Sequence, residues 1–231
     1  MSPKPAGKPQ RLDVVIEAGD RKSFASALDW PGWSRAAKTR EDAIDALLAY
    51  APRYAPVAKL AKLDLPDAFD VEVVQRLPGG SGTDFGVPSR IHEPDTKRVT
   101  AAEARRLAAL VRAAWTTFDR VAAAAPAELR KGPRGGGRDR DKMVGHVLES
   151  DWYYARELGI KAKAPEPTDR KAVEASRAAV LEILGRPSDG TPLGGRTWTA
   201  RYAARRIAWH ALDHAWEMQD RADRGPAPDT G

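Results

Sequence analysis

The sequence contains no cysteine among its 231 residues. This absence excludes structural disulfides, thiolate metal ligands and a cysteine nucleophile, and it is compatible with a reducing cytosol. Long apolar runs are also missing, and the opening residues MSPKPAGKPQ lack the apolar segment of a secretory signal peptide. We therefore expect a cytoplasmic protein with no membrane-spanning segment.

A large excess of one charge is absent as well. The 38 basic and 32 acidic residues leave a formal charge of only +6, and the two signs are interleaved along most of the chain. Charge alone therefore gives little support to nucleic-acid binding, and we expect a small-molecule substrate instead. The length allows one large domain or two small ones.

The first third of the chain has the pattern of a small α+β unit, which we place at residues 11–77. Short β-branched or alternating runs are separated by turn residues such as Gly19-Asp20 and Pro31-Gly32. A capping threonine and an acidic first turn predict a helix from Thr39 to about Tyr50. The predicted strands are 12–18, 23–30, 33–38 and 69–77. The Pro- and Lys-rich residues 1–10 are expected to be a disordered tail.

The rest of the chain predicts an all-α domain. Residues 78–97 begin with a tract rich in Gly and Pro that has little periodicity, so we interpret them as a linker. The predicted helices are 101–125, which Thr100 caps, and about 140–158, about 169–184 and 196–221. Four helices with longer connections favour a four-helix bundle over 98–221, followed by a loose tail at 222–231. The fold class we expect is therefore α+β with two domains.

The chain has only four histidines, and three of them stand in a suggestive pattern. His210 and His214 are four residues apart on a predicted helix, which places both imidazoles on one face. His146 lies near the start of another predicted helix. Three imidazoles could bind zinc, nickel, iron or manganese and leave a coordination position open for catalysis. The competing interpretation is a solvated pair on an Ala- and Arg-rich helix. His92, alone in the linker, is expected to be exposed.

Two carboxylates follow the histidine pair at helical spacing. Asp213 lies three residues after His210, and Glu217 lies three residues after His214. Either carboxylate could orient an imidazole through its second nitrogen. Each could equally be a surface carboxylate that pairs with an arginine of the same helix.

A glycine-rich loop precedes the helix that carries His146. Gly135, Gly136 and Gly137 are flanked by Arg134 and Arg138, but the Lys-Ser/Thr ending of a nucleotide-binding loop is missing. One interpretation is a flexible loop with solvated charges. The hypothesis we carry forward is that Arg134 and Arg138 lie near the metal site and attract an acidic thiol cofactor or substrate.

With His146, His210 and His214 in this order, residues 98–221 resemble the DinB-like metal-dependent bundles. This superfamily includes bacterial thiol S-transferases and mycothiol-dependent maleylpyruvate isomerases. In it, one histidine joins a later His-x-x-x-His pair to hold a divalent metal. The resemblance implies mycothiol or bacillithiol as co-substrate, and a composition typical of a GC-rich genome favours mycothiol. The isomerases usually have Glu where this chain has His210, so the resemblance favours the three-histidine thiol transferases.

Residues 11–77 resemble the HicB-like fold found in antitoxins. The similarity lies in the strand at Val14–Ile16, in Trp30-Pro31-Gly32-Trp33 and in the helix start Thr39-Arg40-Glu41-Asp42-Ala43. The DNA-binding module usual in such antitoxins is not recognisable in this chain.

Together these observations predict a metal-dependent transferase that conjugates or transfers a low-molecular-weight thiol to a small electrophile. One alternative is a non-catalytic interaction protein whose HicB-like domain binds a protein or RNA. Another is a metal-dependent hydrolase that uses a bound water. The sequence leaves open which metal is bound and whether two chains form a homodimer.

Overall fold

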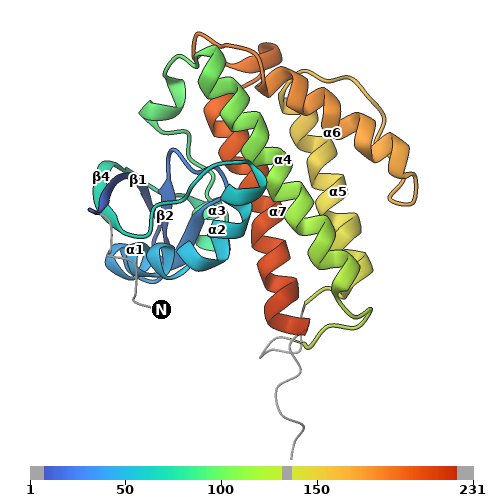
Figure 1. The fold of residues 1–231 in the computed structure, drawn as a ribbon, viewed down its shortest axis with the longest axis horizontal. Helices are drawn as coiled ribbons and strands as arrows, with labels where there is room; N and C mark the ends of the chain where they lie inside the picture. Colours follow the sequence, from blue (N-terminus) through green and yellow to red (C-terminus); the bar gives the residue numbers. More distant parts are fainter. Residues whose placement is uncertain (1–7, 132–136, 223–231) are drawn as a thin grey trace, which may run out of the picture.

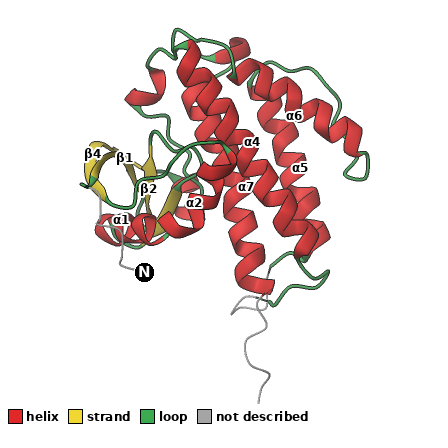
Figure 2. Cartoon of the chain, in the orientation of Figure 1, coloured by secondary structure: helices red, strands yellow, loops and turns green. Residues whose placement is uncertain are grey.

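The computed structural model describes residues 8–131 and 137–222. It has the predicted α+β layout, with a small sheet unit followed by a group of long helices (Figures 1 and 2). The predicted tails at 1–10 and 222–231 lie almost entirely outside the described residues, and Gln10 already belongs to the first strand.

The sheet unit contains four strands in the order β3-β2-β1-β4. The strands are β1 (Gln10–Ala18), β2 (Ser23–Ala27), β3 (Ser34–Ala37) and β4 (Phe69–Pro78). β1 pairs antiparallel with β2 and parallel with β4. The consecutive residues Val14, Val15 and Ile16 are all buried, as expected for a central strand covered on both faces. β4 alternates half-buried and exposed residues, so one of its faces meets solvent.

Two helices cover the sheet, and the second of them was not predicted. α1 (Arg40–Ala49) begins where expected, because the Thr39 hydroxyl accepts a hydrogen bond from the amide of Asp42 at 3.0 Å. α2 (Ala51–Leu60) follows directly, with one proline in its first turn and Pro56 inside it. Proline is tolerated in a first turn, whereas an internal proline disfavours a helix. Burial of one face, including the fully buried Tyr54, stabilises α2 despite Pro56.

The predicted linker is folded against the sheet. It contains the short helix α3 (Ser81–Phe85) and the 3-10 turn η1 (Glu93–Thr96). The amides of Ser89 and Arg90 each donate to the buried carboxylate of Glu17 in β1 at 3.0 Å. These bonds hold a segment that is rich in Gly and Pro against β1.

The expectation that His92 is exposed was wrong. Its side chain is 1% exposed, and its Nε2 lies 3.5 Å from Oε1 of the buried Glu17. The anchoring of the neighbouring backbone to Glu17 carries His92 into the interior.

The helical part contains the four predicted long helices. They are α4 (Ala101–Ala124), α5 (Arg140–Glu157), α6 (Arg170–Leu184) and α7 (Ala200–Ala222). α4 and α7 pack along each other, and α5 and α6 complete the group (Figure 1). α7 starts four residues later than predicted, because residues Leu193–Gly195 form a 3-10 turn and the Leu193 amide bonds to the Trp198 carbonyl at 2.7 Å.

α7 lies between the sheet unit and α5, so it belongs to both halves of the molecule. Side-chain pairs that join the sheet unit to α7 include Phe24 with Trp209, Arg35 with Asp213, and Tyr50 with Trp216. Fourteen residues of α7 are buried, many of them alanines, which allow neighbouring helices to approach closely. Along residues 8–131 and 137–222, no helix has both the length and the apolarity needed to cross a bilayer.

Candidate metal centre

Three imidazoles meet between α5 and α7. One ligand nitrogen from each of His146, His210 and His214 lies within 4.8 Å of the other two. The Nε2 atoms of His146 and His210 are 3.3 Å apart. Two nitrogens bound to one tetrahedral metal, each at about 2.1 Å, are separated by about 3.4 Å. The three histidines therefore form a group that could hold a metal ion.

Glu217 contacts one of these imidazoles directly. Its Oε2 lies 3.0 Å from Nδ1 of His214, and its Oε1 accepts a hydrogen bond from Nη1 of Arg221 at 2.7 Å. The contact with His214, together with Arg221, holds the pKa of Glu217 below its ordinary value, although burial acts against this. Since a carboxylate only accepts hydrogen bonds, Nδ1 of His214 carries the proton and its Nε2 keeps a free lone pair. Sequence spacing left two alternatives for Glu217, a contact with an imidazole or a pair with an arginine, and Glu217 makes both.

Asp213 contacts a different part of the molecule. Its Oδ1 accepts a hydrogen bond from Nη1 of Arg35 in β3 at 3.2 Å, and burial raises the pKa of its carboxyl. Within the described residues, Asp213 makes no hydrogen bond to an imidazole. Nδ1 of His210 is buried there without any hydrogen-bond partner. Asp213 therefore connects the sheet unit to α7 instead of orienting His210.

The surroundings favour neutral imidazoles. Burial, followed by the charges of His214 and Arg206, brings the pKa of His210 well below its ordinary value. Burial and the charge of Arg138 also lower the pKa of His146. Neutral imidazole is the form that binds metals, so these shifts keep the nitrogens of His146 and His210 available near neutral pH.

An aromatic wall flanks His210. The ring centroid of Tyr154 lies 5.6 Å from that of His210, and the centroid of Trp209 lies 6.1 Å away. Tyr154 also packs on Trp198 at 5.1 Å. The near-helical spacing of these aromatic residues is typical of core packing, and it also allows one or two of them to line a pocket. Sequence spacing alone does not distinguish these two roles.

The structure describes only one of the two arginines that flank the glycine-rich loop. Arg134 lies outside the described residues. Arg138 is exposed in the segment that leads into α5, and its positive charge lowers the pKa of both His146 and His210. Arg138 is thus within electrostatic range of the imidazoles. Its role in attracting an acidic ligand stays a prediction.

No family model matches the chain. The curated proteins and the solved structures likewise give no match. The likeness to DinB-like and HicB-like proteins therefore rests on the sequence patterns, to which the structure adds the α+β layout and the group of three histidines.

Proposed function

We propose that the protein is a metal-dependent transferase that conjugates or transfers a low-molecular-weight thiol to a small electrophile. The observation that carries the proposal is the convergence of His146, His210 and His214. Three neutral nitrogen ligands suit zinc, nickel, iron or manganese. A site with three protein ligands leaves room for an exogenous ligand, as catalytic sites do.

Each residue has a defined task in this proposal. A bound divalent metal would lower the pKa of a coordinated thiol and hold its thiolate. Glu217 keeps the proton on Nδ1 of His214, which would leave Nε2 free to bind the metal. Tyr154 and Trp209 exclude water from one side of His210. Arg138 contributes positive charge that attracts an acidic ligand.

The sulfur nucleophile must come from a separate molecule, because the chain has no cysteine. The resemblance to the DinB-like transferases supports mycothiol or bacillithiol as that molecule. A hydrolase is the second candidate, since the same three-histidine set accepts a bound water as readily as a thiol.

Two measurements test the proposal. The first is elemental analysis of protein purified without an affinity tag, comparing wild type with His210→Ala and with His92→Asn as a control. Nearly stoichiometric metal in wild type and in the control, and its loss in His210→Ala, is the expected result. Equal metal content in all three proteins would contradict it.

The second measurement is conjugation of monochlorobimane in the presence of mycothiol or bacillithiol. Turnover that requires both the thiol and the three histidines is expected. Ester or amide hydrolysis independent of added thiol would instead support the hydrolase. A folded wild type without metal would support the non-catalytic interaction protein.

A further inference from the structure

α7 carries four arginines, and three of them pair with carboxylates. These pairs are Arg201 with Glu103, Arg205 with Asp95, and Arg221 with Glu217. Arg206 pairs with no carboxylate among residues 8–131 and 137–222, and its Nη1 is buried there without a hydrogen-bond partner. A buried guanidinium nitrogen that has lost water without gaining an acceptor is unfavourable. Arg201 and Arg221 each have one such nitrogen too, but their guanidinium groups are paired with a carboxylate, which the described part of the chain does not offer to Arg206.

Arg206 lies beside the metal centre. It precedes His210 by four residues, which places both side chains on one face of α7 about 6 Å apart along the helix axis. Its guanidinium carbon is 4.7 Å from the ring centroid of Trp209 and 5.2 Å from that of Tyr154. These are the two rings that flank His210. The guanidinium thus extends the aromatic wall of the site.

The positive charges around the site favour binding of an anion. A divalent cation on three neutral imidazoles brings two positive charges, to which Arg206 and the nearby Arg138 add theirs. Glu217 is already engaged by His214 and Arg221. An arginine forms strong, charge-assisted contacts with carboxylates and with phosphates through two parallel hydrogen bonds. The single fork of Arg206 can contact both oxygens of a carboxylate, whereas a phosphate group would keep further oxygens without a donor from this residue, so a carboxylate is the better match.

We propose that Arg206 is a substrate-binding residue that pairs with the carboxylate of a small organic acid, while another donor atom of the same molecule occupies the open coordination position. This proposal rests on the proposed metal site and names the substrate class for it. The short distance along α7 between Arg206 and His210 requires that the carboxylate and the donor atom be only a few bonds apart.

The test uses Co²⁺-loaded, untagged protein and two probe thiols of similar size. Mercaptopropionate carries a carboxylate, and mercaptopropanol carries a hydroxyl in its place. Binding of either thiolate to Co²⁺ is followed by the sulfur-to-cobalt charge-transfer absorption. A charge-assisted contact with Arg206 should make wild type bind mercaptopropionate about tenfold or more tightly than mercaptopropanol.

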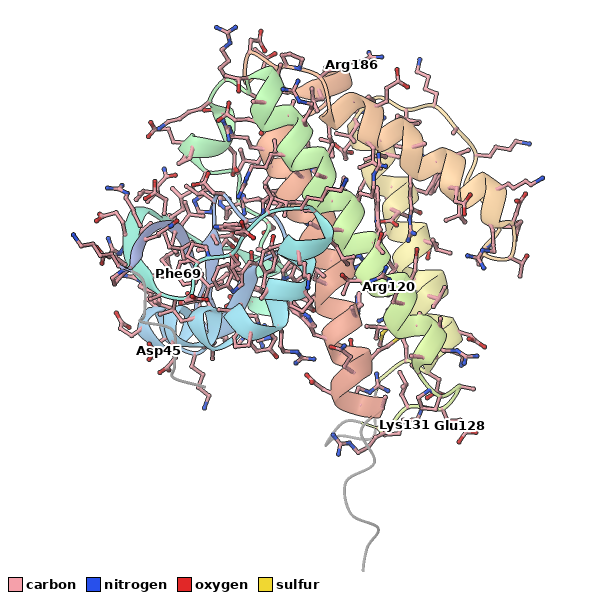
Figure 3. The ribbon with its side chains drawn as sticks, in the orientation of Figure 1. Asp45, Phe69, Arg120, Glu128, Lys131 and Arg186 are labelled. Carbon is pink, nitrogen blue, oxygen red and sulfur yellow. The ribbon has the colours of Figure 1, made fainter. Side chains whose placement is uncertain are left out.

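Three variants test whether Arg206 causes the preference for mercaptopropionate. Arg206→Gln should lose it, and Arg206→Lys should keep part of it because the charge remains. Arg120→Gln removes an exposed arginine from α4, and it should leave the preference unchanged (Figure 3). Circular dichroism and urea unfolding establish that each variant is folded. If Arg206→Gln does not fold, the comparison of Arg206→Lys with wild type decides, because unreduced preference in that variant contradicts a bidentate guanidinium contact.

The outcomes separate this proposal from the one on which it rests. Failure of wild type to bind Co²⁺ would overturn both. Bound Co²⁺ with no preference for mercaptopropionate, or a preference that survives in Arg206→Gln, would overturn the substrate class and leave the metal site standing. Inorganic phosphate displacing mercaptopropionate more effectively than acetate would overturn the assignment to a carboxylate.

Discussion

The imidazole of His214 and the carboxylate of Glu217 are joined at 3.0 Å on successive turns of α7. The same carboxylate is held by Arg221 at 2.7 Å, so its orientation is fixed from both sides. Asp213 occupies the equivalent position after His210, yet it faces Arg35 in the sheet unit. Two carboxylates with the same sequence spacing from a histidine thus contact different partners.

This difference predicts unequal effects on metal binding. Glu217→Ala should weaken metal affinity about tenfold or more, because the proton on Nδ1 of His214 loses its acceptor and the ring loses its orientation. Asp213→Ala should leave the affinity within about threefold of wild type, since among the described residues its carboxylate bonds to Arg35 and to no imidazole. Competition of each folded variant against a chelating dye measures the affinities. Equal losses in both variants would contradict the assignment of Glu217.

A second prediction concerns Asp151, which is buried between α4, α5 and α6. Burial raises its pKa to about 6, although Nε of Arg177 lies 3.5 Å away. The carboxyl of Asp151 therefore binds a proton more tightly in the folded state than in the unfolded chain, where the pKa of an aspartate is about 3.9. The stabilising contribution is complete below about pH 4 and is lost as pH rises through about 6. Its size is about 3 kcal/mol.

The variant Asp151→Asn should remove this pH dependence. Relative to wild type, its free energy of unfolding should rise by up to about 3 kcal/mol between pH 4 and pH 7.5. Asp119→Asn is the matched control, because Asp119 also pairs with Arg177 but is 57% exposed. Urea unfolding at several pH values provides the measurement. A constant difference between Asp151→Asn and wild type across this range would be inconsistent with the raised pKa.

Much of the fold follows from local sequence, whereas the exceptions depend on contacts distant in the chain. The long helices follow from periodicity and from caps such as Thr100, which accepts a hydrogen bond from the amide of Glu103. α2 was missed because Pro56 disfavours a helix, and only burial against the rest of the fold outweighs it. His92 is buried because Glu17, 75 positions earlier, anchors the backbone beside it.

The candidate site was predictable to a similar degree. Helical spacing places His210 and His214 on one face, and it is the packing of α5 against α7 that brings His146 to them. Spacing could not assign Asp213, since its partner Arg35 lies in a distant strand. It also gave no reason to single out Arg206, because only the three-dimensional structure shows that no carboxylate of the described residues pairs with it.

A third prediction contrasts two glycines. Gly32 has a φ of +94°, and a Cβ placed there would lie 2.7 Å from Leu212 and 3.1 Å from Ala208 of α7. Gly32→Ala should therefore lower the free energy of unfolding by about 1–3 kcal/mol, through backbone strain and through separation of the sheet unit from α7. Gly145 lies within α5 with open space around its Cβ position.

Gly145→Ala should have the opposite effect. Alanine favours a helix interior over glycine by about 0.5–1 kcal/mol, so this variant should be more stable than wild type by about that amount. Urea unfolding of both variants under one condition gives the comparison. If Gly32→Ala were as stable as wild type or more stable, the turn at Gly32 would tolerate a side chain next to α7, and the prediction would be wrong.

The last prediction concerns the ion pair that holds η1 to α7. Nε and Nη2 of Arg205 donate to the two carboxylate oxygens of Asp95 at 2.9 and 2.5 Å, and the side chains are only 4% and 1% exposed. The amide of His92 also donates to Asp95 at 2.9 Å. Asp95→Ala would leave a buried guanidinium without its partner, and we expect a loss of about 3–5 kcal/mol in the free energy of unfolding.

An exposed ion pair provides the matched control for this substitution. Glu182 lies on α6 and Arg186 lies just after the end of that helix. Their side chains form an ion pair, and both are 67% exposed. Because solvent screens such a pair, Glu182→Ala should change stability by less than about 0.5 kcal/mol. Urea unfolding at neutral pH measures both variants against wild type. A loss below about 1 kcal/mol in Asp95→Ala would mean that water replaces the carboxylate, and that η1 is not held to α7 by this pair.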